Sequence, residues 1–326
     1  MTIENIKAFN GQHCETTATG TLLLQLGIEL SEPMLFGLGE GLGFIYWNMK
    51  TMDFPFIGGR IKPDILTQNI ARNLNLKLTV KETSSSQKAW NSVKELLDNG
   101  HVVGLKMDCF HLEYFSNPFH FAGHYAAIYG YDHQNTFLVD TQQQGGQVQT
   151  SLESLALARA EKGPMASKNL YYTLKKSDEK FDLKKAISNA IRNNATEYLN
   201  PPITNIAYKG ILKTSTEITK WFHASKDIEA EFGLSAMMME KAGTGGALFR
   251  NLYRDFLKES YEWLRLEQLK TGYEAFSEIA ELWTTVAQLF EKVSKTKDFQ
   301  YIQEASLILR TISGKEKKAM EVLMTI

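Results

Sequence analysis

Residues 123–140 have the sequence GHYAAIYGYDHQNTFLVD. Two apolar runs separated by a short polar turn at residues 132–135 predict a β-hairpin. In such a hairpin the start of the first strand lies beside the end of the second, so we expect the side chains of His124 and Asp140 to meet. An imidazole oriented by a carboxylate acts as the base in many nucleophilic enzymes, and a purely structural hydrogen bond is the alternative.

A cysteine near the N-terminus could be the nucleophile that this pair serves. Residues 12–17 read QHCETT, and apolar residues follow at helical spacing up to Leu26, with Gly27 in the position typical of the residue after a helix. Cys14 is therefore expected in the first helical turn, where the partial positive charge of the helix N-terminus stabilises a thiolate. We predict a triad of Cys14 as nucleophile, His124 as base and Asp140 as the group that orients the base.

The other histidines are weaker partners for this thiol. His13 adjoins it, but the side chains of neighbouring helical residues point about 100° apart. The sequence shows no orienting acid in register with His101, His111, His120, His133 or His223. His120 and His124 have the spacing of some zinc ligands, but Gly123 and the strand after it argue against the helix that this spacing requires. We therefore expect no metal and no cofactor.

Three further features have structural interpretations. Cys109 is expected to be a small buried apolar residue. Residues 36–44, FGLGEGLGF, lack the Gly-Lys-Ser/Thr of a phosphate-binding loop, so we expect close backbone packing or a loop that lines a cleft. Residues 243–246, GTGG, precede a helical pattern and predict a turn, with an anion site at the helix N-terminus as the alternative.

The N-terminal half mixes short helices and strands. Helices are predicted at residues 63–74, 87–97 and 151–160, and strands at 76–80, 101–107 and 170–174 in addition to the hairpin. Residues 108–123 form an aromatic-rich loop that contains Phe110, Tyr114, Phe115, Phe119 and Phe121. Over a cleft, these rings would form the walls of a substrate site.

The C-terminal half is helical in period. After a charge-rich linker at residues 175–180, apolar stripes recur, and the longest includes Tyr273, Phe276, Trp283, Phe290 and Val293. Such stripes are the packing faces of a helical bundle. The fold class is therefore expected to be α+β: a domain with an N-terminal helix and an antiparallel sheet at residues 1–176, followed by an all-α accessory domain at residues 177–326.

Acidic and basic residues are balanced. With 36 lysines and arginines against 37 aspartates and glutamates, no global field attracts nucleic acid or an anionic membrane. The N-terminus lacks the basic start and apolar run of a signal peptide, and no apolar stretch is long enough to span a bilayer. We expect a cytoplasmic protein without nucleic-acid or membrane partners, and its oligomeric state stays open.

Several of these blocks resemble a known group of enzymes. The His13-Cys14 pair that opens a helix and the blocks at residues 123–132 and 137–140 look like the Cys, His and Asp blocks of papain-like cysteine enzymes. The last two blocks are most similar to those of the double-glycine bacteriocin-processing peptidases. The His-Cys start, the glycine-rich residues 36–44 and a helical C-terminal half with a Gly-Gly…Phe-Arg…Leu-Tyr turn resemble the butirosin biosynthesis protein H family over essentially the whole chain.

This resemblance implies a papain-like domain that, as in the family's namesake, moves an acyl group from a carrier-protein thioester to an amine of an aminoglycoside. It makes Cys14 the acyl-accepting thiolate, His124 the general base and acid, and Asp140 the orienting group. The implied partners are an acyl-thioester donor, such as one on a phosphopantetheinyl carrier protein, and a small amine in specialised metabolism. Papain-type enzymes have an oxyanion-hole glutamine where this chain has Ala8, so we expect the Cys14 backbone N–H as donor, with Gln12 as the second candidate.

Two other functions stay open on the sequence. A cysteine peptidase or amidase would use the same thiolate chemistry but release the acyl group to water as the free acid. A non-catalytic binding module that retains the fold would have a Cys14 thiol that reacts no faster than a free thiol.

Overall fold

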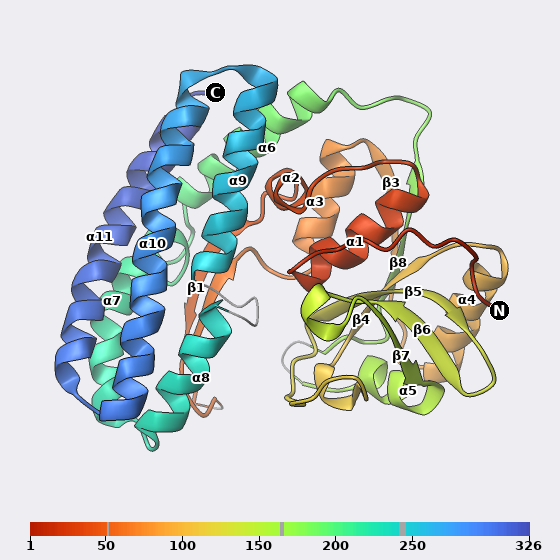
Figure 1. The fold of residues 1–326 in the computed structure, drawn as a ribbon, viewed down its shortest axis with the longest axis horizontal. Coiled ribbons are helices and arrows are strands. Elements are labelled where there is room, and N and C mark those ends of the chain that lie inside the picture. Colours follow the sequence, from red (N-terminus) through yellow and green to blue (C-terminus); the bar gives the residue numbers. More distant parts are fainter. Residues whose placement is uncertain (51, 164–165, 241–245) are drawn as a thin grey trace. The chain divides into compact units, whose positions relative to one another are not determined.

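The computed structural model of the chain describes residues 1–50, 52–163, 166–240 and 246–326. They divide into two compact units, each built from two segments. Unit 1 comprises Met1–Leu35 and Pro63–Phe181, and unit 2 comprises Phe36–Lys62 and Asp182–Ile326. The predicted α+β class is confirmed (Figure 1). The predicted domain boundary between residues 176 and 177 stays a prediction. The two compact units differ from the predicted domains chiefly because residues 36–62 pack with the C-terminal helices.

Unit 1 contains a six-stranded antiparallel sheet with the order β3-β8-β4-β5-β6-β7 (Figure 1). Its strands are β3 (Leu76–Lys81), β4 (Val103–Met107), β5 (His124–Tyr131), β6 (Asn135–Val139), β7 (Gln147–Ser151) and β8 (Tyr171–Lys176). Its helices are α1 (Cys14–Gln25), α3 (Ile65–Asn73), α4 (Ser86–Asp98) and α5 (Leu152–Ala160), with short 3-10 turns at Cys109–His111 and Gln142–Gln144. Helix α2 (Glu32–Leu38) begins in unit 1.

Different helices cover the two faces of this sheet. The cross-strand pair Leu105 and Ala126 joins Leu155 of α5 and residues of α4 in one apolar core. The next pair, Lys106 and Tyr125, points to the opposite face, because successive side chains alternate along a strand. There Lys106 Nζ lies 2.8 Å from Asp64 Oδ2 and the Tyr125 hydroxyl donates to Asp64 Oδ1, just before α3. Helices α4 and α5 thus cover one face, and α1 and α3 the other.

The local patterns of unit 1 are largely confirmed. Helix α1 begins at Cys14, and Gly27 has a φ of +71°, a left-handed conformation that suits glycine after a helix. The predicted hairpin is present as β5 and β6, and its turn is held by Asp132 Oδ1, which accepts from the backbone N–H groups of Gln134 and Asn135. Strand β7, which follows a turn at residues 145–146, was not predicted.

The glycine-rich residues 36–44 are not one loop. They include the end of α2 and the start of β1 (Leu42–Trp47), which pairs with β2 (Phe56–Arg60) in a separate two-stranded sheet. A Cβ on Gly37 would lie 2.1 Å from Cγ of Phe256, and one on Gly43 would lie 2.8 Å from the Arg60 backbone. The prediction of close packing is therefore confirmed. The alternative prediction, a loop that lines a cleft, is wrong because helix and strand residues occupy most of the stretch.

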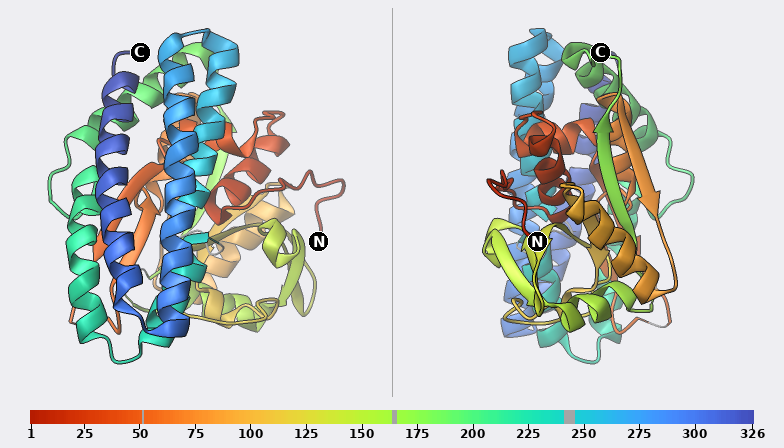
Figure 2. Two further views of the ribbon diagram at one scale, coloured as in Figure 1. Left: turned by 60° about the vertical axis from the view of Figure 1, so that its left-hand side comes forward. Right: turned by 90° about the vertical axis from the view of Figure 1, so that its right-hand side faces the viewer.

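Unit 2 is a set of long helices with the β1–β2 hairpin packed on them. They are α6 (Leu183–Leu199), α7 (Ala207–Ala224), α8 (Ile228–Glu240), α9 (Gly246–Leu264), α10 (Glu267–Thr296) and α11 (Phe299–Leu323). Helices α10 and α11 run side by side (Figure 1 and the left view of Figure 2). The predicted apolar stripe lies in α10 and buries Phe276, Trp283 and Phe290, as expected. Residues 243–245 of the predicted turn lie outside the described residues, and Gly246 begins α9.

A buried ion pair links the helices of unit 2. Arg250 of α9 and Glu316 of α11 are fully buried, and Arg250 Nε and Nη2 donate to the two carboxylate oxygens at 2.9 and 3.0 Å. Trp283 Nε1 donates to the same carboxylate at 2.9 Å, and the Tyr198 hydroxyl also donates to it. Arg250 Nη1 donates to the carbonyl of Gly59 in β2 at 2.9 Å. The pair therefore ties the hairpin and four helices together. No described helix of the chain is long and apolar enough to cross a membrane.

Arg250→Met should destabilise the protein by about 3–5 kcal/mol, because it leaves the Glu316 carboxylate buried without its cation. Urea unfolding followed by circular dichroism measures this loss. The double variant Arg250→Met with Glu316→Leu removes both charges and should unfold at a higher urea concentration than Arg250→Met alone. A double variant that is no more stable than the single one would show that the uncompensated charge is not the cause.

Candidate active site

Cys14 occupies the N-terminus of α1. It is the first helical residue and is partly exposed. His13 precedes it in an extended conformation, and its carbonyl accepts from the Thr17 backbone N–H at 2.9 Å, as the first turn of a helix requires. The predicted placement of the thiol in the first turn is thus present, in reach of the positive end of the helix dipole.

The carboxylate of Glu32 fixes the segment that delivers this cysteine. Glu32 Oε1 accepts from the backbone N–H groups of Gln12 and His13 at 2.9 and 2.8 Å, and from Thr16 Oγ1 at 2.7 Å. Glu32 lies at the start of α2 and is buried. The same acid therefore holds the loop before Cys14 and the first turn of α1.

These hydrogen bonds to Glu32 restrict which backbone N–H groups are available to stabilise an oxyanion. The N–H groups of Gln12 and His13 are bound to Glu32. The first N–H groups of α1 have no partner within the helix, because the first turn of any helix leaves its donors unsatisfied. Cys14 N–H is one of these, which keeps it the preferred donor. The Gln12 side chain is exposed, and its role as the second donor stays a prediction.

The β5–β6 hairpin brings His124 and Asp140 together. His124 is the first residue of β5, and Asp140 follows the last residue of β6. His124 Nε2 lies 2.7 Å from Asp140 Oδ2, and both side chains are buried. Asp140 Oδ1 accepts from the Thr141 backbone N–H at 2.6 Å. The predicted contact between the two side chains is present, and the catalytic role of the triad stays a prediction.

The surroundings of His124 favour its charged form. Burial alone lowers the pKa of the imidazole, but the Asp140 carboxylate opposes it, with further contributions from Cys109 and Cys14, and the net pKa of His124 is well above its usual value. Because this folded-state pKa is raised, the ion pair stabilises the fold at and below neutral pH, and that stabilisation is lost as the pH rises through the raised pKa. His124 is therefore an imidazolium at neutral pH, which is the partner a thiolate needs.

The second cysteine also lies near this histidine. Cys109 is buried, as predicted, but its thiol is close enough for His124 to act on its pKa through charge and hydrogen bonding. Burial outweighs the histidine and raises the pKa of Cys109. It therefore stays a neutral thiol at physiological pH, whereas the partly exposed Cys14 lies at a helix N-terminus. The environment of Cys14 suits a nucleophile, and that of Cys109 does not.

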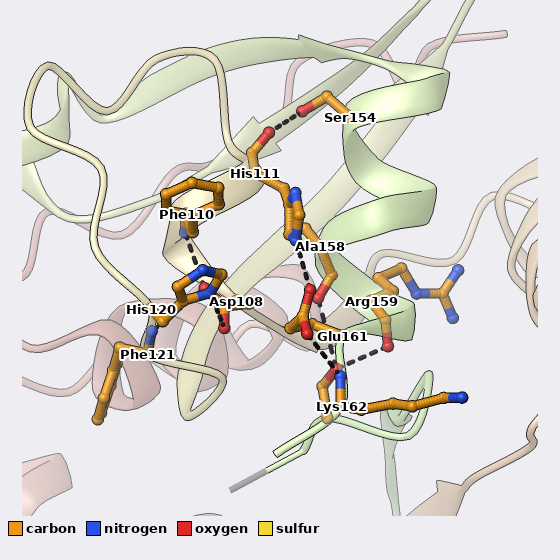
Figure 3. Close-up of polar contacts among 11 residues, drawn as sticks. Asp108, Phe110, His111, His120, Phe121, Ser154, Ala158, Arg159, Glu161 and Lys162 are labelled. Atoms are coloured by element: carbon orange, nitrogen blue, oxygen red, sulfur yellow. Dashed lines mark hydrogen bonds and ion pairs between the residues drawn. The ribbon is translucent and has the colours of Figure 1, made fainter. Parts of the chain in front are cut away.

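Two further histidines contact carboxylates outside the triad (Figure 3). His111 Nε2 lies 2.6 Å from Glu161 Oε2, and His120 Nδ1 lies 3.4 Å from Asp108 Oδ2. Both acids are distant in sequence from their histidines, so the expectation that these histidines lack an acidic partner is wrong. Within the described ranges, no group of three or more His, Cys, Asp or Glu side chains is arranged to hold a metal ion.

Of three further residues that contact the site, Glu32 was not predicted, and Tyr114 and Phe115 were predicted only as walls of a substrate site. Glu32 binds the segment before Cys14, the Tyr114 hydroxyl donates to Asp140, and the Phe115 ring packs edge-on against His124. The aromatic loop was predicted to supply walls, and a signal for Tyr114 was present in it as a polar aromatic side chain in an apolar segment. Nothing in the sequence near Glu32 indicated its partners.

Comparison with protein-family models gives two matches. Residues 13–141 match the family described as butirosin biosynthesis protein H, N-terminal, and residues 153–323 match the family described as domain of unknown function (DUF4872). The first match begins one residue before Cys14 and ends one residue after Asp140, so it contains all three predicted triad residues. The description of this first family names a biosynthetic protein. A search of curated proteins gave no match.

The pH dependence of iodoacetamide labelling tests the electrostatics of this site. Wild-type Cys14 should be labelled well below pH 7, because the raised pKa of His124 provides an imidazolium there. His124→Gln should slow labelling at pH 6, because it removes the imidazolium that would stabilise a thiolate. Cys14→Ser, which leaves only the buried Cys109, is the control that identifies the labelled residue. Identical profiles for wild type and His124→Gln would contradict this electrostatic coupling.

Proposed function

The chain belongs to the DUF4872 family and carries a butirosin biosynthesis protein H N-terminal domain, and on this premise we propose that it is a cysteine-dependent acyltransferase of specialised metabolism. The observation that carries the proposal is the buried contact between His124 and Asp140, in a structural unit where Cys14 opens a helix. A buried imidazolium, an oriented carboxylate and a thiol at a helix N-terminus are the parts of a cysteine nucleophile site.

In the first half of the proposed reaction, Cys14 takes the acyl group. The thiolate of Cys14 attacks the carbonyl carbon of a thioester, and the negative charge that develops on the oxygen is stabilised by the Cys14 N–H. When the carbon–sulfur bond to the donor breaks, the His124 imidazolium gives its proton to the leaving thiolate. The products are an acyl-Cys14 thioester, a free thiol and a neutral His124.

In the second half, an amine removes the acyl group. Neutral His124 takes the proton from the attacking amine, the new carbon–nitrogen bond forms, and the bond to Cys14 Sγ breaks. This step regenerates the Cys14 thiolate and the His124 imidazolium, and it releases an amide. Asp140 stays ionised throughout and holds the imidazole in one orientation.

The aromatic side chains around His124 favour an amine over water as the acceptor of the acyl group. The Phe115 ring lies 5.3 Å from the His124 ring in an edge-on arrangement, and the partly buried Tyr114 donates a hydrogen bond to Asp140. A base shielded in this way works in a site with little free water, which limits hydrolysis of the acyl-enzyme. The proposed donor is an acyl thioester, such as one on a phosphopantetheinyl carrier protein, and the acceptor is a small amine.

The acyl-enzyme provides the direct test of this mechanism. Incubation with acyl thioesters should add the mass of the acyl group to Cys14, and Cys14→Ala should lose at least about a thousandfold in thioester turnover. Peptide mass spectrometry locates the adduct. Cys109→Ser is the matched control and should still form the adduct on Cys14.

Unchanged thioester turnover by Cys14→Ala would reject the mechanism. Adding candidate amines to the acyl-enzyme then separates transfer from hydrolysis. An amide product supports the acyltransferase, whereas the free acid alone, whatever amine is supplied, would make the protein a thioesterase or amidase. A wild-type protein that forms no adduct with any thioester would favour a binding module.

A further inference from the structure

We propose that Tyr114 is a positioning residue of this site, whose phenol holds the Asp140 carboxylate in the orientation that the His124 imidazole needs. Asp140 Oδ2 accepts two hydrogen bonds of 2.7 Å, one from the Tyr114 hydroxyl and one from His124 Nε2. Oδ1 accepts from Thr141 N–H, so both carboxylate oxygens are engaged. The consequence for catalysis rests on the proposed function, whereas the effect on the histidine does not.

The direction of the tyrosine hydrogen bond follows from its surroundings. Burial and the neighbouring Asp140 charge raise the pKa of Tyr114 well above its usual value. The phenol therefore keeps its proton at all physiological pH values and can only donate to the ionised carboxylate. Two donors on one oxygen divide its negative charge between them, so Tyr114 moderates the attraction between Asp140 and the imidazolium.

The loop that carries Tyr114 is fastened at both ends (Figure 3). Asp108 Oδ1 accepts from the backbone N–H of Phe110 at 2.8 Å and from that of Phe121 at 3.2 Å, so one buried carboxylate closes the loop. Ser154 Oγ of α5 donates to the His111 carbonyl at 2.6 Å. A residue in a loop tied down in this way has a fixed position, which a positioning role requires.

The residue after Tyr114 supports the same histidine. Phe115 and His124 have ring centroids 5.3 Å apart and an interplanar angle of 89°. Tyr114 therefore restrains the carboxylate while Phe115 restrains the imidazole. The titratable groups around His124 are Asp140, Cys109 and Cys14, so a change in its titration reports on this small set.

Tyr114→Phe tests the proposal because it removes the hydroxyl and keeps the ring. Without the second donor, the whole charge of Oδ2 acts on His124, so its pKa should rise further, visible in the NMR titration of the imidazole. Acyl transfer should fall about tenfold in kcat with little change in KM, which is the size of effect expected for a hydrogen bond to a charged group. A proton held more tightly by His124 is given less readily to the leaving thiolate.

Tyr129→Phe is the matched control. Tyr129 lies in β5, and the structure gives no hydrogen bond from its hydroxyl to any described residue. This variant should keep the wild-type His124 titration and turnover. Thermal unfolding of both variants separates a local effect from a loss of folded protein.

The proposal is overturned if His124 titrates identically in Tyr114→Phe, Tyr129→Phe and the wild type. The NMR titration requires no acyl substrate, so it is informative even if acyl transfer fails. A shifted titration in a protein without acyltransferase activity would support the positioning role and reject the proposed function. An unshifted titration in an active acyltransferase would reject the positioning role of Tyr114 and support the proposed function.

Discussion

The buried carboxylate of Asp140 is the constraint on which the candidate site depends. A carboxylate removed from water is strongly destabilising unless donors replace its hydration. Here three donors do so, and they come from three places in the chain: His124 at the start of β5, Tyr114 in the aromatic loop, and the backbone of Thr141. The pairing of β5 with β6 brings the histidine to the carboxylate, and the fastened loop brings the phenol. The same contacts that satisfy the charge therefore orient the imidazole.

A second buried carboxylate, that of Glu32, binds the backbone that leads into Cys14. Glu32 receives N–H groups from the backbone before Cys14, so it fixes the path of the chain into α1. Because these two donors are engaged, the Cys14 N–H at the start of α1 stays the preferred oxyanion donor. The two carboxylates thus have separate functions, which their partners determine. Asp140 raises the pKa of His124, and Glu32 fixes the position of Cys14, the proposed nucleophile.

The parts of this arrangement that depend on local sequence were predictable, and those that depend on distant contacts were not. The hairpin that joins His124 to Asp140 and the helix that begins at Cys14 follow from strand and helix periodicity and from turn residues. Glu32 gave no such signal, and the sequence around Tyr114 indicated an aromatic loop but not the hydrogen bond to Asp140, because each residue finds its partners only after the loops close. The glycines at residues 37 and 43 signalled close approach, but their sequence does not reveal that Phe256 and Arg60 are the groups that approach them. Local patterns thus determine the elements, and tertiary contacts determine which side chains orient the site.

The most direct test of this account is the NMR titration of His124 in the wild type and in Asp140→Asn. The account predicts a wild-type pKa well above the ordinary histidine value of about 6.5, and a lower pKa in Asp140→Asn, where the carboxylate no longer opposes the effect of burial. A wild-type pKa at or below the ordinary value, or the same pKa in both proteins, would contradict the central claim that Asp140 keeps His124 charged for the thiolate of Cys14.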